Sequence, residues 1–190
     1  MTEPVEQPKA LAPGVFPPEV AELDGFRLRR PAPADAVVLL DAVTDSFAEL
    51  HPWMPWATEP VELANQEAFI TRCLEQWPTG RFFNWFIIDA GGALIGSISL
   101  MDRIGPGGVE IGYWLRTGAT GRGVMTRAAA WVTDVALSLE GADRVEIHCD
   151  AQNVRSAAVP RRLGFRLDRT VSVEPSAPGE SGLRQIWVTS

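Results

Sequence analysis

The sequence predicts a single α/β domain with a mixed, mostly antiparallel central sheet flanked by about four helices. Its 190 residues suffice for one domain with a sizeable core. Apolar runs with strand character alternate with stretches whose apolar residues recur at helical spacing. The clearest junction spans residues 108–137, where a strand, a glycine-rich turn and a helix follow one another. We expect the rest of the fold to be organised around this junction.

The remaining elements follow in chain order. Residues 1–24, rich in Pro, Glu and Ala, predict a flexible arm or one that packs only against a partner, and residues 25–190 are expected to form the domain. Strands are expected at residues 25–30, 82–89, 93–100, 108–115, 144–150, from 165 onward, and at 183–189. Helices are expected at residues 37–47, 61–77 and 124–137, and a last helix with Asn153 as its N-cap is expected to end at residue 163. The length of the connection between residues 115 and 144 favours a parallel pair of strands.

Composition excludes several classes of protein. The net charge of −7 argues against a nucleic-acid or membrane partner, and no apolar run approaches the length of a membrane span. The amino terminus lacks the layout of a secretory signal. Cys73 and Cys149 are predicted to be buried free thiols in a reducing cytosol, so the expected location is cytoplasmic. With only two histidines, no metal site is expected.

The glycine-rich turn has the properties of an anion site. The first amides of a helix have no internal acceptor and lie at the positive end of the helix dipole. Gly121 and Gly123 lack a Cβ, so a phosphate can approach these amides closely. Two familiar phosphate motifs do not fit. Residues 124–126 lack the Lys of a Walker loop, and Thr126 stands where a dinucleotide fingerprint needs its third glycine.

The turn resembles the acyl-CoA-binding segment of the GCN5-related N-acetyltransferases (GNAT). The family pattern Arg/Gln-x-x-Gly-x-Gly/Ala falls on residues 120–125, where Gly123 matches, Thr120 replaces the basic or amide residue and Met125 replaces the last small one. The resemblance implies that acetyl-CoA is the cosubstrate and that backbone amides hold its pyrophosphate. The implied cofactor-binding residues are Leu115, Arg116, Thr117, Thr120, Gly121, Arg122, Gly123, Val124, Met125, Thr126, Asn153 and Ser156.

A second segment extends the resemblance. Asn153, followed by a small residue at Ser156 and a helix ending in Leu-Gly-Phe at residues 163–165, matches the family's last motif. Together the motifs cover residues 108–169, and a weaker match at the opening extends this to nearly the whole chain after Phe26. The EIGYWL and GRGVMT segments resemble the branch that acetylates N-terminal amines of ribosomal proteins. The resemblance to this branch implies that a primary amine attacks acetyl-CoA directly in a ternary complex.

Acetyl transfer to an amine needs a proton acceptor and a group that stabilises the leaving thiolate. Glu110 is the candidate proton acceptor and would act through a water molecule. The other interpretation is that Glu110 is only a surface carboxylate, and Glu174 and Glu180 are rival candidates. In many family members a Tyr at the position of Pro160 donates a proton to the leaving thiolate. This chain lacks that Tyr, so Ser156 is the candidate donor to the thiolate. Its hydroxyl is equally expected to cap the helix. A covalent route through Cys149 is disfavoured, because apolar neighbours raise a thiol pKa.

The acceptor pocket is expected to contain aromatic side chains. Residues 51–57 hold two Trp and a Met between prolines, which fits either a loop over the core or a pocket wall. The predicted substrate-binding residues are Trp53, Trp56, Trp85 and Tyr113. An N-terminal α-amine of a protein is the expected acceptor. The sequence leaves four alternatives open. The acceptor is a small amine such as an amino acid, polyamine or antibiotic; the donor is succinyl-CoA; the chain is a non-catalytic CoA-binding module; or the protein is a homodimer.

Overall fold

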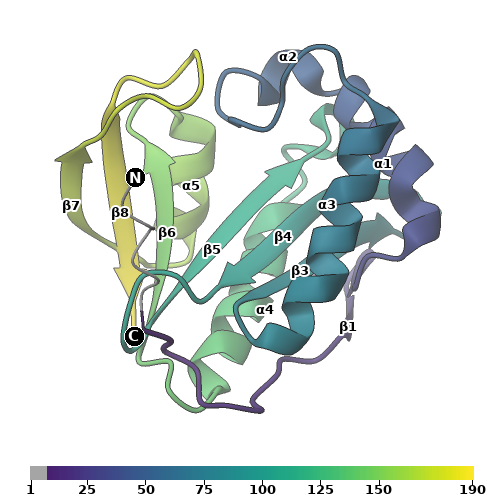
Figure 1. The fold of residues 1–190 in the computed structure, drawn as a ribbon. Coiled ribbons are helices and arrows are strands. Elements are labelled where there is room, and N and C mark those ends of the chain that lie inside the picture. Colours follow the sequence, from purple (N-terminus) through teal and green to yellow (C-terminus); the bar gives the residue numbers. More distant parts are fainter. Residues whose placement is uncertain (1–7) are drawn as a thin grey trace, which may run out of the picture.

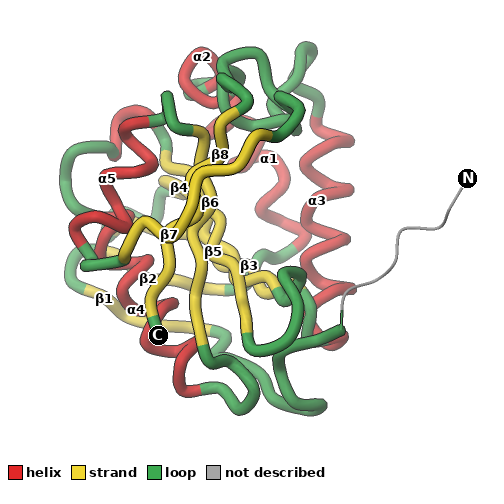
Figure 2. Tube along the Cα trace, turned by 90° about the vertical axis from the view of Figure 1, so that its left-hand side faces the viewer, coloured by secondary structure: helices red, strands yellow, loops and turns green. Residues whose placement is uncertain are grey.

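The computed structural model describes residues 8–190 and has one twisted sheet with helices on both faces (Figure 1, Figure 2). In this part of the chain the strand order is β1-β2-β3-β4-β5-β6-β8-β7, which confirms the predicted α/β class. The strands are β1 (Val20–Leu23), β2 (Phe26–Arg29), β3 (Phe82–Asp89), β4 (Leu94–Met101), β5 (Gly108–Leu115), β6 (Arg144–Asp150), β7 (Arg166–Ser172) and β8 (Leu183–Thr189). The helices are α1 (Ala36–Thr44), α2 (Phe47–Leu50), α3 (Leu63–Gln76), α4 (Val124–Ser138) and α5 (Val154–Arg162), with 3-10 turns at Pro33–Asp35, Trp77–Thr79 and Thr117–Ala119.

The parallel pair of β5 and β6 sits among antiparallel neighbours. Residues 108–111 pair with residues 144–147, and the ladder ends there. Beyond this point residues 112–115 pair only with β4, and residues 148–150 pair only with β8. The two strands therefore splay apart toward their carboxyl ends, as Figure 1 shows.

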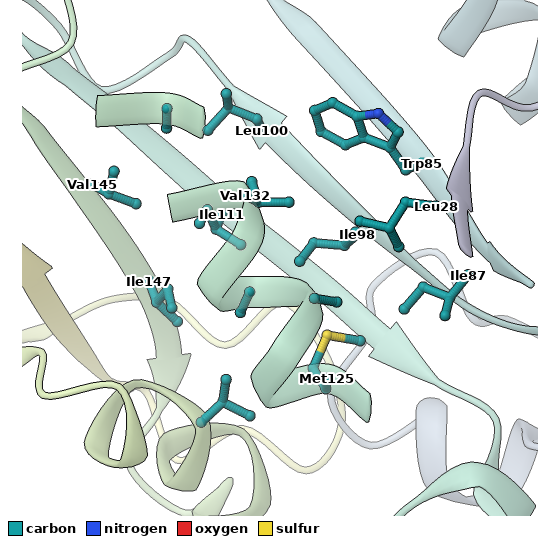
Figure 3. Packing of buried hydrophobic residues seen from close by; sticks show 14 of the residues in the cluster. Leu28, Trp85, Ile87, Ile98, Leu100, Ile111, Met125, Val132, Val145 and Ile147 are labelled. Atoms are coloured by element: carbon teal, nitrogen blue, oxygen red, sulfur yellow. The ribbon is translucent and has the colours of Figure 1, made fainter. Parts of the chain in front are cut away.

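The main core lies between the sheet and α4. Because side chains alternate along a strand, Val109 and Ile111 of β5 face α4 together with Val145 and Ile147 of β6. They pack on small residues of α4 and on aliphatic residues of β2 to β4 (Figure 3). The other face is covered by α1 and α3, mainly over β3 and β4, through a second cluster that includes Leu39, Ile70, Phe86 and, from the end of β5, Trp114. On this face β5 carries Glu110 and β6 carries Glu146 and His148, which are polar.

The prediction of a flexible N-terminal arm is wrong from residue 8 onward, and residues 1–7 lie outside the described residues. Leu11 is buried in the main core, and its backbone amide donates to Asp102 over 3.0 Å. The Pro18 carbonyl accepts from Trp85 Nε1 over 2.9 Å, and β1 then pairs with β2. The prolines exclude a helix but permit an extended chain, and that chain packs on its own domain instead of a partner.

Most predicted elements are confirmed with small shifts of their ends. The strands at residues 108–115, 144–150 and 183–189 have the predicted bounds, and the parallel pair is the one expected. Helix α5 begins at Val154, directly after the predicted cap Asn153, and continues past Pro160. The short strand β1 and the one-turn helix α2 were not predicted, because elements of four residues show too little periodicity.

Candidate active site

A cavity of about 1590 Å³ lies on the face of the sheet that carries α3 and opens to solvent. Its floor is formed by β3 to β6, one wall by α3 and the 53–58 loop, and the opposite wall by the loop between β7 and β8. The two loops touch above the floor, where the Gly179 amide donates to the Pro52 carbonyl over 2.8 Å. Figure 1 shows these loops side by side above the carboxyl ends of β5 and β6. The cavity is large enough for several residues of a bound peptide.

The cavity continues through the gap between β5 and β6 that opens beyond Ile111 and Ile147, which we call the splay. Its lining includes Ile111 and Tyr113 of β5 and Ile147 and Cys149 of β6, whose side chains belong to the α4-facing side of the sheet. A molecule bound on one face can therefore meet a molecule threaded in from the other.

The glycine turn lies at the end of β5 and opens α4. Gly121 and Gly123 have φ of +77° and +71°, a region that side chains rarely adopt. A Cβ at Gly121 would meet nothing within 4 Å, and one at Gly123 would lie 3.1 Å from Arg127 Nη1. Since the first-turn amides of a helix have no internal acceptor, this surface provides donors, a nearby guanidinium and open space for a phosphate.

Three of the predicted cofactor residues are engaged within the chain. Arg116 forms an ion pair with Asp45. The Thr117 amide donates to Ser46 Oγ over 3.1 Å, and its hydroxyl donates to Glu49 over 2.9 Å. The Thr120 hydroxyl donates to the Thr117 carbonyl over 2.9 Å. These side chains therefore fix the shape of the turn against the start of α2. Residues 121–123 are exposed, whereas Val124 and Met125 are buried in the main core, so these two could offer an anion only their backbone amides.

The start of α5 lies across the splay from this turn. Asn153 caps the helix as predicted, because its side-chain oxygen accepts from the Ser156 amide over 3.1 Å. Both residues line the cavity. The Ser156 hydroxyl lies 3.3 Å from the Tyr113 hydroxyl, to which it donates, so it is placed inside the passage between the two faces.

Tyr113 and Cys149 surround Ser156 in the splay, and both are protonated groups. Burial is the main reason why the pKa of the Tyr113 hydroxyl lies well above its usual value. Burial likewise raises the pKa of the Cys149 thiol. Cys73 and Cys149 are both buried free thiols, as predicted. A thiol held in its protonated form is a poor nucleophile, which agrees with direct attack by the amine.

Glu110 faces the cavity from β5, as predicted from strand alternation. It is buried, and both of its oxygens accept from Arg103, with Nε–Oε2 and Nη2–Oε1 distances of 2.9 and 2.7 Å. The hydrogen bonds to Glu110 raise the pKa of Arg103 and keep its charge. Glu110 is therefore part of a bidentate ion pair at the cavity floor, an arrangement that the sequence did not predict.

Sequence reasoning missed a second polar group beside Glu110. His148 Nε2 lies 2.6 Å from Glu146 Oε2, and His148 Nδ1 lies 3.7 Å from Glu110 Oε2. Arg144 Nε donates to the other oxygen of Glu146 over 2.9 Å. Burial alone would raise the pKa of Glu146, but the hydrogen bonds from His148 and Arg144 outweigh it, and this pKa is lowered. The missed signal was the alternation in RVEIHCD, which puts Glu146 and His148 on one face.

Neutral polar side chains complete the floor. Asn84 Nδ2 donates to Ser97 Oγ over 2.9 Å and to Ser99 Oγ over 2.7 Å, and all three residues line the cavity. Gly112 lies directly opposite Ser99 on β5. A Cβ there would come within 2.9 Å of the Met101 methyl group, so a glycine keeps the floor open at this point.

The predicted aromatic residues divide between the cavity and the core. Trp53 and Trp56 line the cavity, and Trp56 packs on Trp114 with ring centroids 6.1 Å apart. Trp85 was predicted to bind substrate, but it is fully buried on the α4 side of the sheet and contacts Trp77 and Trp131. The prediction for Trp85 is therefore wrong, because its position on β3 directs it away from the cavity. Tyr113 lies in the splay beside Ser156 and not in the aromatic wall.

Residues 26–166 match the family described as the acetyltransferase (GNAT) domain. The chain belongs to this family. As a GNAT acetyltransferase it is an enzyme that transfers the acetyl group of acetyl-CoA to an amine. Its glycine turn, its splayed strands and the start of α5 are the features of this chain that fit the cosubstrate.

Similar proteins support this assignment. YdaF of Bacillus subtilis strain 168, named as a candidate ribosomal N-acetyltransferase, is 29% identical over 139 residues, covering 70% of this chain and 73% of YdaF. The structure of the microcin C7 self-immunity acetyltransferase MccE with acetyl-CoA and AMP superposes with a TM-score of 0.80 at 22% identity, covering 88% and 93% of the two chains. RimL, the ribosomal L7/L12 alpha-N-protein acetyltransferase, superposes in its coenzyme A complex with a TM-score of 0.78 at 21% identity, covering 92% and 97%.

Two further observations concern metal-binding groups and long apolar helices in the described residues. Among residues 8–190, no three His, Cys, Asp or Glu side chains are grouped so that they could hold a metal ion. The same part of the chain has no helix that combines the length and apolar character needed to cross a membrane.

Proposed function

We propose that the acceptor is the N-terminal α-amine of a protein or peptide, of the ribosomal-protein type. The names of YdaF and RimL support this choice, since both describe acetylation of ribosomal proteins. The observation that carries it is the open cavity of about 1590 Å³ that joins the splay. A chain terminus can lie on the polar floor and present its amine at the point where β5 and β6 part.

Three carboxylates near the splay would receive a cationic terminus. Glu110, Asp150 and Glu180 line the cavity from β5, from β6 and from the β7–β8 loop, while Arg72, Arg81, Arg103 and Arg184 line it as well. An α-ammonium with a pKa of about 8 also gives up its proton more readily than a Lys side chain at about 10.4. The site therefore favours α-amines over internal lysines.

Each part of the site has a proposed role in the reaction. The amides of residues 121–126 and Arg122 would hold the pyrophosphate, with Asn153 and Ser156 on the opposite side of the splay. When bound, acetyl-CoA supplies the acyl group as a thioester. The Ser156 hydroxyl, which donates to the Tyr113 hydroxyl over 3.3 Å in the structure, would turn to donate a hydrogen bond to the leaving thiolate. Glu110 would stabilise positive charge near the amine.

A small amine is the second candidate acceptor. The aromatic pair of Trp56 and Trp114 and the loop contact between Gly179 and Pro52 partly cover the cavity, which would suit a compact ligand. An amino acid, a polyamine or an antibiotic, with acetyl or succinyl transfer, belongs to this alternative.

The test is a panel of acceptors analysed by mass spectrometry. It contains peptides beginning with Ser, Thr or Ala, the same peptides with a blocked N-terminus and an internal Lys, and small amines, each with acetyl-CoA and with succinyl-CoA. We expect acetylation of the free N-termini at least about tenfold faster than of the blocked peptides. Equal labelling of blocked peptides, or turnover confined to small amines, would contradict the proposal.

A further inference from the structure

The environment of Glu110 makes it a poor proton acceptor. Both carboxylate oxygens are engaged by the Arg103 guanidinium, and the ion pair is buried on the glutamate side. A proton arriving at Glu110 would have to displace the bidentate hydrogen bonds from Arg103 at a carboxylate that is only 8% exposed. The group that receives the amine proton should therefore be sought nearby.

His148 has the geometry of a general base. Its Nε2 contacts Glu146 Oε2 over 2.6 Å, and a carboxylate only accepts, so Nε2 carries the hydrogen and Nδ1 carries the lone pair. Nδ1 lies 3.7 Å from Glu110 Oε2, too far for a hydrogen bond. Within residues 8–190 the structure gives Nδ1 no hydrogen-bond partner. The same logic, with a carboxylate fixing one ring nitrogen and leaving the other free, operates in catalytic triads.

The position of His148 also suits the reaction. It follows Ile147, the last residue of β6 that pairs with β5, so it stands where the two strands part. The side chain is 15% exposed and lines the cavity. An amine that enters along the α3 side of the floor would meet His148 before it reaches the splay.

We propose, resting on the proposed function, that His148 is the general base of the acetyl transfer and that Glu146 positions it. The α-ammonium gives one proton to Nδ1, and the free amine uses its lone pair to form the C–N bond. The C–S bond breaks, and its electron pair leaves on sulfur as the thiolate, which is protonated from the Ser156 side. The attacking nitrogen loses its second proton to water in the open cavity. His148 later releases the proton that it accepted to solvent.

Charged side chains surround the His148 ring on its face of the sheet. Glu146 lies on the same strand, and Glu110 faces His148 from β5. Asp150 and Arg184, which pair with each other across β6 and β8, lie on the same sheet face as His148. Arg103 and Arg144 are engaged by Glu110 and Glu146 respectively. The two charged groups nearest the ring are thus the carboxylates of Glu146 and Glu110, each of which also contacts an arginine.

The first test compares H148Q and E110Q with the unmodified enzyme on a free-amine peptide. We expect H148Q to lower kcat by about 100-fold or more and to remove the acid limb of the kcat–pH profile, since the base must be unprotonated. The CoA dissociation constant, measured by calorimetry, should change less than twofold and shows that the variant is folded. E110Q should retain the acid limb. An acid limb that survives in H148Q and vanishes in E110Q would overturn the inference.

Chemical rescue separates catalysis from structure. In H148A the missing ring opens onto the cavity, so added imidazole should restore part of the rate, whereas a purely structural loss would not respond. Absence of rescue, with CoA binding intact, would count against His148 as the base.

A third measurement needs no activity and no catalytic variant. The chain has two histidines, so the nitrogen NMR signals of wild type and H51Q assign His148 directly. We expect the neutral His148 ring to carry its proton on Nε2, and a proton on Nδ1 would overturn the proposal. If the wild-type enzyme acetylates none of the free-amine peptides, the proposed function fails instead, and the tautomer result stands apart from that outcome.

Discussion

The Tyr113 hydroxyl donates a 2.9 Å hydrogen bond to the Ser156 carbonyl. In an uninterrupted helix this carbonyl would accept from the amide of residue 160, but Pro160 has no N–H. A side chain from β5 therefore replaces the missing backbone donor of α5. The contact ties together the two elements that border the splay, and it depends on the proline that replaces the family's usual tyrosine.

We predict that Y113F lowers the free energy of unfolding by about 1–3 kcal/mol, because a partly buried carbonyl loses its donor. P160A restores a backbone N–H to that carbonyl. The penalty of Y113F should therefore be smaller in the P160A background by about 1 kcal/mol. Urea unfolding of the four proteins of this cycle measures the coupling. Additive effects would show that the tyrosine does not substitute for the missing amide.

The second prediction concerns the glycine turn. G123A must hold a Cβ at φ of +71° and places it 3.1 Å from Arg127 Nη1, so we expect CoA affinity to fall by about tenfold, about 1.4 kcal/mol. The matched control is G118A, because Gly118 has no positive φ and a Cβ there meets nothing within 4 Å. Calorimetry with CoA measures both variants. Equal affinities for the two would argue that the amides of α4 do not hold the pyrophosphate.

The third prediction is a pH effect at Asp150. Burial alone would raise its pKa, but hydrogen bonds from the amides of Gln152 and Ser181 and from the Ser181 hydroxyl outweigh it, so the pKa is lowered. A pKa that is lower in the folded state than in the unfolded state, where it is about 3.9, stabilises the protein at pH values above that value. This stability is lost as the pH falls through the folded-state pKa.

We therefore expect D150N to be less stable than wild type at pH 7 and to lose less stability on acidification. The difference in slope is at most about 1.4 kcal/mol per pH unit, the limit for one proton. The exposed Asp134 on α4 provides the control variant D134N. Urea unfolding between pH 2.5 and 7 gives the slopes, and parallel curves for D150N and wild type would refute the prediction.

The fourth prediction separates two tryptophans that were expected to share a role. W85A should cost about 3–5 kcal/mol of stability, because the side chain is fully buried in the core. Trp56 is 46% exposed, so W56A should cost less than about 1 kcal/mol and should instead raise KM for the peptide acceptor. Thermal melts and steady-state kinetics distinguish the two effects. A peptide KM unchanged in W56A would remove Trp56 from the acceptor site.

Local sequence patterns determined most of the elements and the turn that we propose as the cosubstrate site. The strand at residues 108–115, the glycine turn and the helix after it are specified by residues close together in the chain, and so is the Asn153 cap. Such features depend on backbone conformation and on helix ends, which neighbouring residues control. The sequence could therefore indicate the glycine turn that we propose for the pyrophosphate and the residue that caps α5.

Only the tertiary structure decided which side chains meet at the acceptor site. Glu110 of β5 is paired in register with Glu146 of β6, and this pairing places His148 beside Glu110. Arg103 reaches the Glu110 carboxylate from the β4–β5 connection. The sequence determined that the strands alternate, but the face that each tryptophan occupies followed from where α3 and α4 cover the sheet. These relations depend on register and packing between segments far apart in the chain, and periodicity within one segment cannot specify them.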